Sequence, residues 1–187
     1  KQKIFRKRDK ITDIYHVVCQ KTADFLTGKY NNNPLTNKPV ISIPLWVNPK
    51  IWKPLNSLLN LRKKWRIPID AYVVGSFQRD TEGKPLSKGK IVPKLEKGPD
   101  ILCKILEDIH NIRKNNNKKQ LCVLLSGCRR DYVIYNLKKM NIPYIYYEML
   151  ELHQLNELYN CLDLYIVSSR CEGGPRAILE SGISRIP

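Results

Sequence analysis

The most informative stretch of the chain is LYIVSSRCEGGPRAILE, residues 164–180. Its apolar run over residues 164–167 predicts a short buried β-strand, because β-branched and aromatic side chains favour strands. Gly173, Gly174 and Pro175 then end the strand and open a helix, since proline suits a first helical turn. A glycine-rich turn before a helix presents unpaired backbone N–H groups, which favour a phosphate or a hydroxyl-rich ligand. The stretch therefore predicts a strand, a ligand-binding turn and a helix.

Two carboxylates, Glu172 and Glu180, flank this turn. From Gly174 to Glu180 a helix advances about 9 Å, so the two side chains can grip different parts of one extended ligand. A carboxylate can accept two hydrogen bonds from the vicinal hydroxyls of a ribose or a sugar ring. Two glutamates at this spacing are by themselves more simply a solvated helix face. The turn between them is what favours a site.

The chain before this stretch alternates between predicted strands and helices. Strands are expected at residues 71–74, 121–125 and 144–147, and helices at residues 99–112, 130–140 and 152–162. This alternation predicts a Rossmann-like α/β fold, a parallel sheet with helices on both faces. Ligands of such sheets bind outside the carboxyl ends of the strands. Gly127, Ser169 and the turn that carries Glu148 and Met149 all follow predicted strands, so we expect them at the site.

Two cations complete the candidate set. Arg79 follows the predicted strand at residues 71–74, and Lys97 precedes the helix that begins at Pro99. Positive side chains at neighbouring strand ends would neutralise a diphosphate and the charge of a diphosphate leaving group. Either residue alone is more simply surface charge in a basic chain. Between them lies a Gly-, Pro- and Lys-rich loop, residues 80–95, whose length is typical of functional loops or insertions.

Composition narrows the function classes. The 187 residues are 42% hydrophobic and 27% charged, as in ordinary globular proteins, and carry a net charge of +16. Lysine and arginine are scattered through every segment, which favours a solvated basic surface over a nucleic-acid site. The six cysteines form no metal-binding pattern with each other or with histidine. Cys103, Cys122 and Cys161 stand among apolar residues, and we expect buried free thiols in a reducing, cytoplasmic compartment.

Three segments together resemble a known family: VVGSFQR (residues 73–79), KGPD (97–100) and LYNCLDLYIVSSRCEGGPRAILE (158–180). They are similar to the C-terminal half of a group 1 (family 4) retaining glycosyltransferase with the GT-B fold. The segment IPLWVNP, residues 43–49, resembles the crossing between the two domains of that family. The resemblance implies a Rossmann-like nucleotide-sugar-binding domain over residues 40–187, incomplete at its C-terminus. Residues 1–39 would be a basic leader, either loose or an edge segment at its start, and a remnant of the inter-domain or N-terminal region.

The resemblance also implies roles for the turn residues. In the family, the glutamate that matches Glu180 binds the ribose hydroxyls of the nucleotide. The glutamate that matches Glu172 contacts the donor sugar, with the backbone N–H groups of Gly173 and Gly174 beside it.

The remaining roles concern the diphosphate and the base. Arg79 and Lys97 match the pair that clamps the donor diphosphate, and with Glu172 they form the implied catalytic set. Glu148 and Met149 match the region that reads the nucleobase. The implied reaction is retaining transfer from a UDP-, GDP- or ADP-linked sugar, without a cofactor or a metal. Since the N-terminal acceptor domain would be missing, we expect the chain to bind a donor but not to transfer it alone.

Two other interpretations remain open. A basic nucleic-acid-binding domain without enzymatic activity would need lysine and arginine gathered on one face, and its affinity would fall steeply with salt. A peripheral membrane contact is suggested by the amphipathic helix expected at residues 55–65. Its apolar and basic residues could lie on an anionic surface: Leu58, Leu59, Leu61, Trp65 and the cluster Arg62, Lys63 and Lys64.

Overall fold

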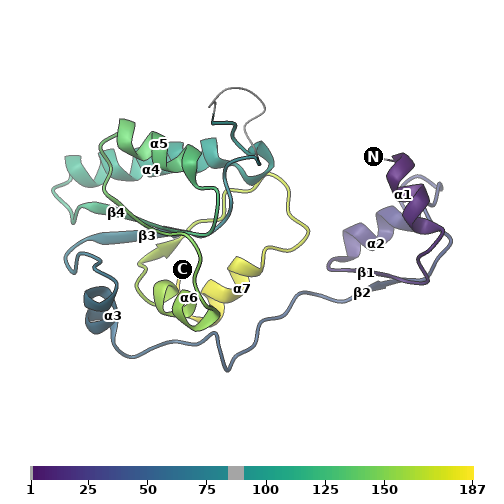
Figure 1. The fold of residues 1–187 in the computed structure, drawn as a ribbon, viewed down its shortest axis with the longest axis horizontal. Coiled ribbons are helices and arrows are strands. Elements are labelled where there is room, and N and C mark those ends of the chain that lie inside the picture. Colours follow the sequence, from purple (N-terminus) through teal and green to yellow (C-terminus); the bar gives the residue numbers. More distant parts are fainter. Residues whose placement is uncertain (1, 84–90) are drawn as a thin grey trace. The chain divides into compact units, whose positions relative to one another are not determined.

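The computed structural model describes residues 2–83 and 91–187, and most of its helices and strands are labelled in Figure 1. The chain divides into two compact units. The first unit comprises Lys1–Trp46 and Glu172–Arg176, and the second comprises Val47–Cys171 and Ala177–Pro187. Part of the predicted loop, residues 84–90, lies outside the described residues.

The second unit is built on a four-stranded parallel sheet. Its strands are β3 (Tyr72–Ser76), β4 (Leu121–Ser126), β5 (Tyr144–Tyr147) and β6 (Leu164–Tyr165), in the spatial order β5-β4-β3-β6. All three strand pairs are parallel, with Val74 opposite both Val123 and Leu164. The predicted strand at residues 164–167 is therefore shorter than expected. The parallel sheet itself confirms the Rossmann-like α/β fold that the alternation predicted.

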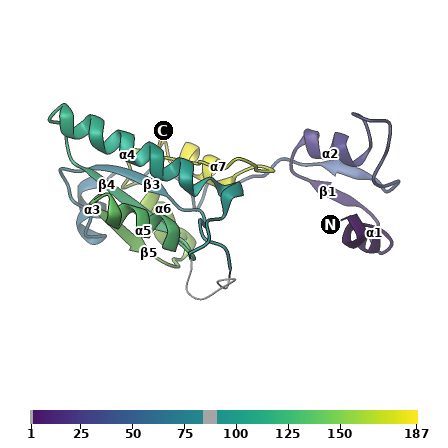
Figure 2. The same ribbon diagram turned by 90° about the horizontal axis from the view of Figure 1, so that it is seen from above.

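Helices cover both faces of this sheet, as Figures 1 and 2 show. One layer holds α4 (Pro99–Asn115) and α5 (Asp131–Lys139), and the other holds α3 (Leu58–Lys64), α6 (Leu152–Tyr159) and α7 (Arg176–Ile183). A short 3-10 helix, η1 (Leu95–Lys97), precedes α4. The strand residues alternate between the two layers, because successive side chains of a strand point to opposite faces. All six residues of β4 are buried, as expected for a central parallel strand.

The two cores follow from this alternation. Val74, Val123 and Leu125 pack with Leu102, Leu106, Val133 and Leu137 of α4 and α5. Val73, Cys122 and Leu124 pack on the opposite face with Trp52, Trp65, Leu158 and Tyr159. Cys103, Cys122 and Cys161 are buried free thiols, as the sequence predicted. Burial raises the pKa of these thiols to about 12, 11 and 12.

The first unit is a small α/β arrangement of its own. It contains α1 (Gln2–Asp9), β1 (Tyr15–Val17), α2 (Gln20–Leu26) and β2 (Val40–Ser42), and β1 pairs with β2 in parallel. The start of the chain is thus helical, and neither the loose nor the edge segment that we expected. Asp9, at the end of α1, accepts hydrogen bonds from the Tyr15 and Thr36 hydroxyls at 2.9 and 2.6 Å. Because β2 pairs with β1, residues 40–46 belong to this unit, although the expected boundary assigned them to the larger domain.

The helix expected at residues 55–65 is shorter in the structure, where α3 leaves Leu58, Leu59, Lys63 and Lys64 exposed but two other residues of the expected stretch are buried. Its Arg62 is buried and donates hydrogen bonds to the carbonyls of Cys161, Ile69 and Ala71 and to the Asp163 carboxylate. Trp65 is buried as well, and its indole N–H donates to Glu157 at 2.8 Å. These two residues therefore stabilise the fold and cannot face a membrane. Among the described helices, none combines the length and the apolar character that crossing a bilayer requires.

Candidate functional site

The strand order places a switch point between β3 and β6. From β3 the chain continues through α4 to β4 and then β5 on one side, and it returns to the other side of β3 as β6. A crevice forms outside the carboxyl ends of parallel strands where the strand order reverses in this way. The residues that leave these two strands are therefore the natural candidates for a binding site: Phe77, Gln78 and Arg79 after β3, and residues 166–171 after β6.

Gln78 lies at the centre of the switch point and connects three segments. Its Nε2 donates to the Lys97 carbonyl at 2.9 Å and to Ser168 Oγ at 3.1 Å. Its Oε1 accepts a hydrogen bond from Ser169 Oγ at 3.0 Å. Ser168 Oγ also donates to the Lys97 carbonyl, at 3.1 Å. Of the predicted site residues, Lys97 and Ser169 are thus held together through one amide group.

The ion pair of Arg170 and Asp100 holds the segment after β6 against the start of α4. Arg170 forms a bidentate pair with Asp100 in the first turn of α4, at 2.7 and 2.6 Å. The Asp100 hydrogen bonds raise the pKa of Arg170, and the hydrogen bonds from Arg170 lower the pKa of Asp100. The backbone N–H of Arg170 also donates to the Glu96 carbonyl at 2.9 Å. A pair with this fork geometry is stronger than a single-point contact.

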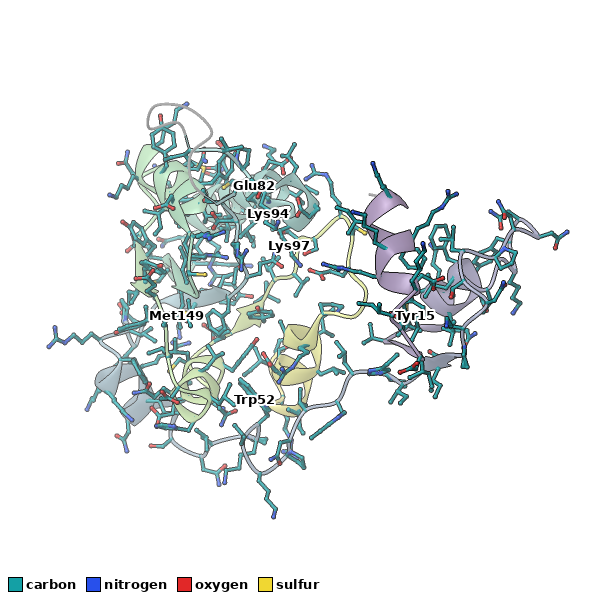
Figure 3. The ribbon with its side chains drawn as sticks, turned by 45° about the vertical axis from the view of Figure 1, so that its right-hand side comes forward. Tyr15, Trp52, Glu82, Lys94, Lys97 and Met149 are labelled. Carbon is teal, nitrogen blue, oxygen red and sulfur yellow. The ribbon has the colours of Figure 1, made fainter. Side chains whose placement is uncertain are left out.

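Positive charge gathers beside this point. Arg79 is exposed and Lys97 is half-buried. Lys94 lies near both of them, as Figure 3 shows for Lys97, and the charge of Arg79 acts on it. Lys94 pairs with Glu96 at 2.5 Å and with Glu82 at 3.7 Å, and the hydrogen bond to Glu96 is the main cause of its raised pKa. The charge of Lys94 is therefore balanced by the carboxylates of Glu82 and Glu96.

Glu180 of α7 is buried at 9% exposure and is held from α6. The Tyr159 hydroxyl donates to Glu180 Oε2 at 3.0 Å. Tyr159 packs against Tyr165 of β6, with ring centroids 4.9 Å apart, and Tyr165 accepts a hydrogen bond from the Phe77 N–H at 3.1 Å. Burial raises the pKa of both tyrosines, so both remain protonated at neutral pH. These contacts link Glu180 to the carboxyl ends of β3 and β6.

The glycine turn belongs to the first unit. Glu172, Gly173 and Gly174 are exposed, and a Cβ at Gly174 would lie 3.3 Å from Leu45 and 3.5 Å from Val18. Gly174 has φ +151°, a conformation that glycine adopts most readily. Since Glu172 and Glu180 belong to different units, their joint grip on one ligand stays a prediction.

The other predicted residues occupy the neighbouring strand ends. Gly127 follows β4 with φ +93°, and its N–H donates to the Tyr147 carbonyl at 3.3 Å. A Cβ at Gly127 would lie 3.4 Å from the Phe77 carbonyl oxygen, so this glycine adjoins the switch point. Glu148 and Met149 follow β5 and are exposed. Figure 3 shows Met149 well apart from Lys97, so any shared ligand must be extended.

A buried ion pair that the sequence did not indicate lies beneath the site. Arg130 Nε lies 3.1 Å from Asp80 Oδ2, and the two side chains are 0% and 2% exposed. Burial raises the pKa of Asp80 and lowers that of Arg130. The backbone N–H groups of Asp80 and Thr81 donate to the Arg129 carbonyl, at 3.2 and 3.1 Å. The pair thus fastens the residues next to Arg79 to the start of α5.

Sequence reasoning missed Gln78, Asp100, Arg170 and this pair as working residues. Gln78 stood out only as part of the segment VVGSFQR, and Arg130 only as the first residue of the helix expected at residues 130–140. Within the described ranges 2–83 and 91–187, no group of three or more His, Cys, Asp and Glu could hold a metal ion.

No family model and no curated protein matches the sequence. Solved structures do match the fold. Sucrose-phosphate synthase from Thermosynechococcus elongatus has a TM-score of 0.70 and 14% identity, over 100% of this chain and 43% of its own. HepE from Anabaena, in complex with UDP and glucose, has a TM-score of 0.70 and 18% identity, over 100% of this chain and 47% of its own. WaaG, a glycosyltransferase involved in lipopolysaccharide biosynthesis, has a TM-score of 0.65 and 15% identity, over 92% of this chain and 42% of its own.

The fold is therefore the α/β Rossmann-like fold of a domain of GT-B glycosyltransferases, as the resemblance in the sequence implied. The chain spans less than half the length of each of these proteins.

Proposed function

We propose that this chain is the donor-binding domain of a glycosyltransferase and binds a nucleoside-diphosphate sugar at the carboxyl ends of β3 and β6. The observation that carries the proposal is that Gln78, next to Arg79, hydrogen-bonds the Lys97 carbonyl and Ser169, while Tyr159 links Glu180 to the same strand ends. The GT-B fold supports the same assignment, because HepE of this fold was solved with UDP and glucose.

In this proposal the two cations bind the diphosphate. Arg79 presents a planar guanidinium that can donate two parallel hydrogen bonds to phosphate oxygens, and Lys97 supplies a second positive charge. Both charges stabilise the diphosphate more strongly as the bond to the sugar breaks, since negative charge then grows on the leaving diphosphate. Arg79 and Lys97 would thus lower the barrier to departure of the nucleoside diphosphate.

The carboxylates bind the two ends of the donor. Glu180 would accept hydrogen bonds from the ribose hydroxyls, and the Tyr159 hydroxyl orients its carboxylate. Glu172 would contact the donor sugar, with the N–H groups of Gly173 and Gly174 beside it. Transfer would proceed with retention at the anomeric carbon, and without a metal or a cofactor. Because the chain spans less than half of its structural neighbours, the proposal for this chain itself is donor binding.

Calorimetric titration with UDP-, GDP- and ADP-linked sugars tests the proposal. We expect saturable binding of one nucleotide class and weaker binding by Lys97→Gln, which keeps the backbone carbonyl that Gln78 and Ser168 contact. Lys104→Gln is the matched control, because Lys104 is an exposed lysine of α4 paired with Glu107 and Asp108. Absence of binding by every donor, or equal binding by both variants, contradicts the proposal.

A further inference from the structure

The turn that carries Lys97 is held in place by hydrogen bonds to its backbone carbonyl groups. Three successive carbonyl groups in this turn accept hydrogen bonds from the residues after β3 and β6. The Leu95 carbonyl accepts from the Arg170 guanidinium at 2.9 Å, and the Glu96 carbonyl accepts from the Arg170 N–H at 2.9 Å. The Lys97 carbonyl accepts from Gln78 and Ser168 at 2.9 and 3.1 Å. The position of the Lys97 backbone is thus set by other segments of the site.

The turn also packs directly on the segment after β6. Gly98 has φ +60°, and a Cβ there would lie 2.0 Å from the Ser168 carbonyl oxygen. No residue with a side chain fits between these two backbones unless one of them moves. The bidentate Arg170–Asp100 pair closes the same contact from the first turn of α4.

Gln78 is the residue that precedes Arg79 in the chain. Its side chain binds the Lys97 carbonyl, while its own backbone carries Arg79. One side chain therefore couples the backbones of both cations. A diphosphate places its charges at a fixed separation, so two cations bind it well only when their spacing matches.

We propose that Gln78 and the Arg170–Asp100 pair are positioning residues, which set the spacing of Arg79 and Lys97 for the two phosphate groups of the donor. The inference rests on the proposed function and deepens it. Gln78 acts through the Lys97 carbonyl and Ser169, and Arg170 acts through the Leu95 and Glu96 carbonyls. Both contributions concern the phosphates and not the base or the ribose.

The test compares diphosphates with monophosphates on the whole chain. Dissociation constants for UDP, GDP and ADP, and for UMP, GMP and AMP, are measured by calorimetry on the wild type, Gln78→Met and Arg170→Lys. Methionine keeps the length of Gln78 without its hydrogen bonds, and lysine keeps the charge of Arg170 without its fork. We expect Gln78→Met to weaken diphosphate binding about tenfold and monophosphate binding much less, because misplaced groups lose affinity for the second phosphate. Arg170→Lys should give a smaller loss with the same selectivity.

Asp108→Asn is the matched control, because it removes an exposed ion pair from the same helix, with Lys104. Asp108→Asn should leave the ratio of diphosphate to monophosphate affinity unchanged. If Gln78→Met and Arg170→Lys weaken both nucleotide forms equally, their role is only structural and the inference is wrong. If the ratio of diphosphate to monophosphate affinity is unchanged in Gln78→Met and Arg170→Lys, the inference is likewise wrong. If the wild type binds none of the six nucleotides, the proposed function fails and the inference fails with it.

Discussion

Tyr159 and Glu180, on α6 and α7, are joined by a hydrogen bond of 3.0 Å from the tyrosine hydroxyl to the buried carboxylate. The tyrosine ring also contacts Phe77, Trp52 and Tyr165 at centroid distances of 4.8, 5.5 and 4.9 Å. A carboxylate that is 9% exposed is costly unless it is hydrogen-bonded. Tyr159 therefore both stabilises α7 and orients the carboxylate that we assign to the ribose.

Removing this hydroxyl should destabilise the protein. We expect Tyr159→Phe to lower the free energy of unfolding by about 1–3 kcal/mol, because the buried Glu180 carboxylate loses the hydrogen bond from the tyrosine hydroxyl. Denaturation in urea measures the change. Tyr135→Phe is the matched control, since Tyr135 is 58% exposed, and it should have almost no effect. Equal stability of the two variants would show that the hydrogen bond contributes nothing.

Replacing Gly98 and Gly182 by alanine should change the stability of the protein in opposite directions. Gly98→Ala should destabilise the protein by at least about 2 kcal/mol, because a Cβ would strike the Ser168 carbonyl in a left-handed conformation. Gly182→Ala, within α7, meets no heavy atom within 4 Å and should stabilise the protein by about 0.5–1 kcal/mol. Thermal unfolding of both variants checks the pair. A neutral Gly98→Ala would mean that the turn is not packed as described.

Removing one member of the buried Asp80–Arg130 pair should destabilise the protein more than removing both. Asp80→Ala leaves the fully buried Arg130 without its counter-ion and should cost about 3–5 kcal/mol. The double variant Asp80→Leu with Arg130→Met removes both charges and should recover most of that loss. Urea denaturation of the single and double variants measures the difference. A double variant as unstable as the single one would show that the pair contributes more than mutual neutralisation.

The Arg170–Asp100 pair should make stability depend on pH in a defined direction. Arg170 lowers the pKa of Asp100 in the folded state, so the folded chain binds fewer protons than the unfolded chain near the ordinary carboxyl pKa. The stabilisation is present above the unfolded pKa of Asp100, about 4, and is lost as the pH falls through the lower folded value. The difference in stability between the wild type and Asp100→Asn should therefore be greatest near neutral pH and vanish in acid. A difference that grows in acid would contradict the ion pair.

Much of the fold could be predicted from local sequence. The apolar run of β4 and the helical periodicity of α4 need no distant partner to be recognised, and both elements are found where the pattern predicts them. Arg62 could not be placed in this way. Its neighbours are basic and its helix is amphipathic, but its partners Cys161 and Asp163 stand about 100 positions away in the chain. The buried Arg130 was missed for the same reason.

The candidate site was predictable in part. Strand ends indicated where Gly127 and Ser169 would lie, because parallel strands bring their carboxyl ends to one edge, and the glycine turn indicated the helix that carries Glu180. The Gln78 contacts depend on side-chain geometry between three segments, which no local pattern encodes. The pairing of β2 with β1 was not predicted for a related reason, since the partner of a strand depends on residues distant in the chain.

The most direct test of donor binding is titration of Glu180→Gln with the nucleoside diphosphate that binds the wild type best. Glutamine keeps an oxygen that can accept the Tyr159 hydroxyl, so the fold should persist, and melting temperature checks this. We expect binding to weaken by about 1–3 kcal/mol, the usual loss for a charge-assisted contact. A Glu180→Gln variant that is folded and binds the nucleotide as tightly as the wild type would contradict the assignment of Glu180 to the ribose, and with it the proposed donor site.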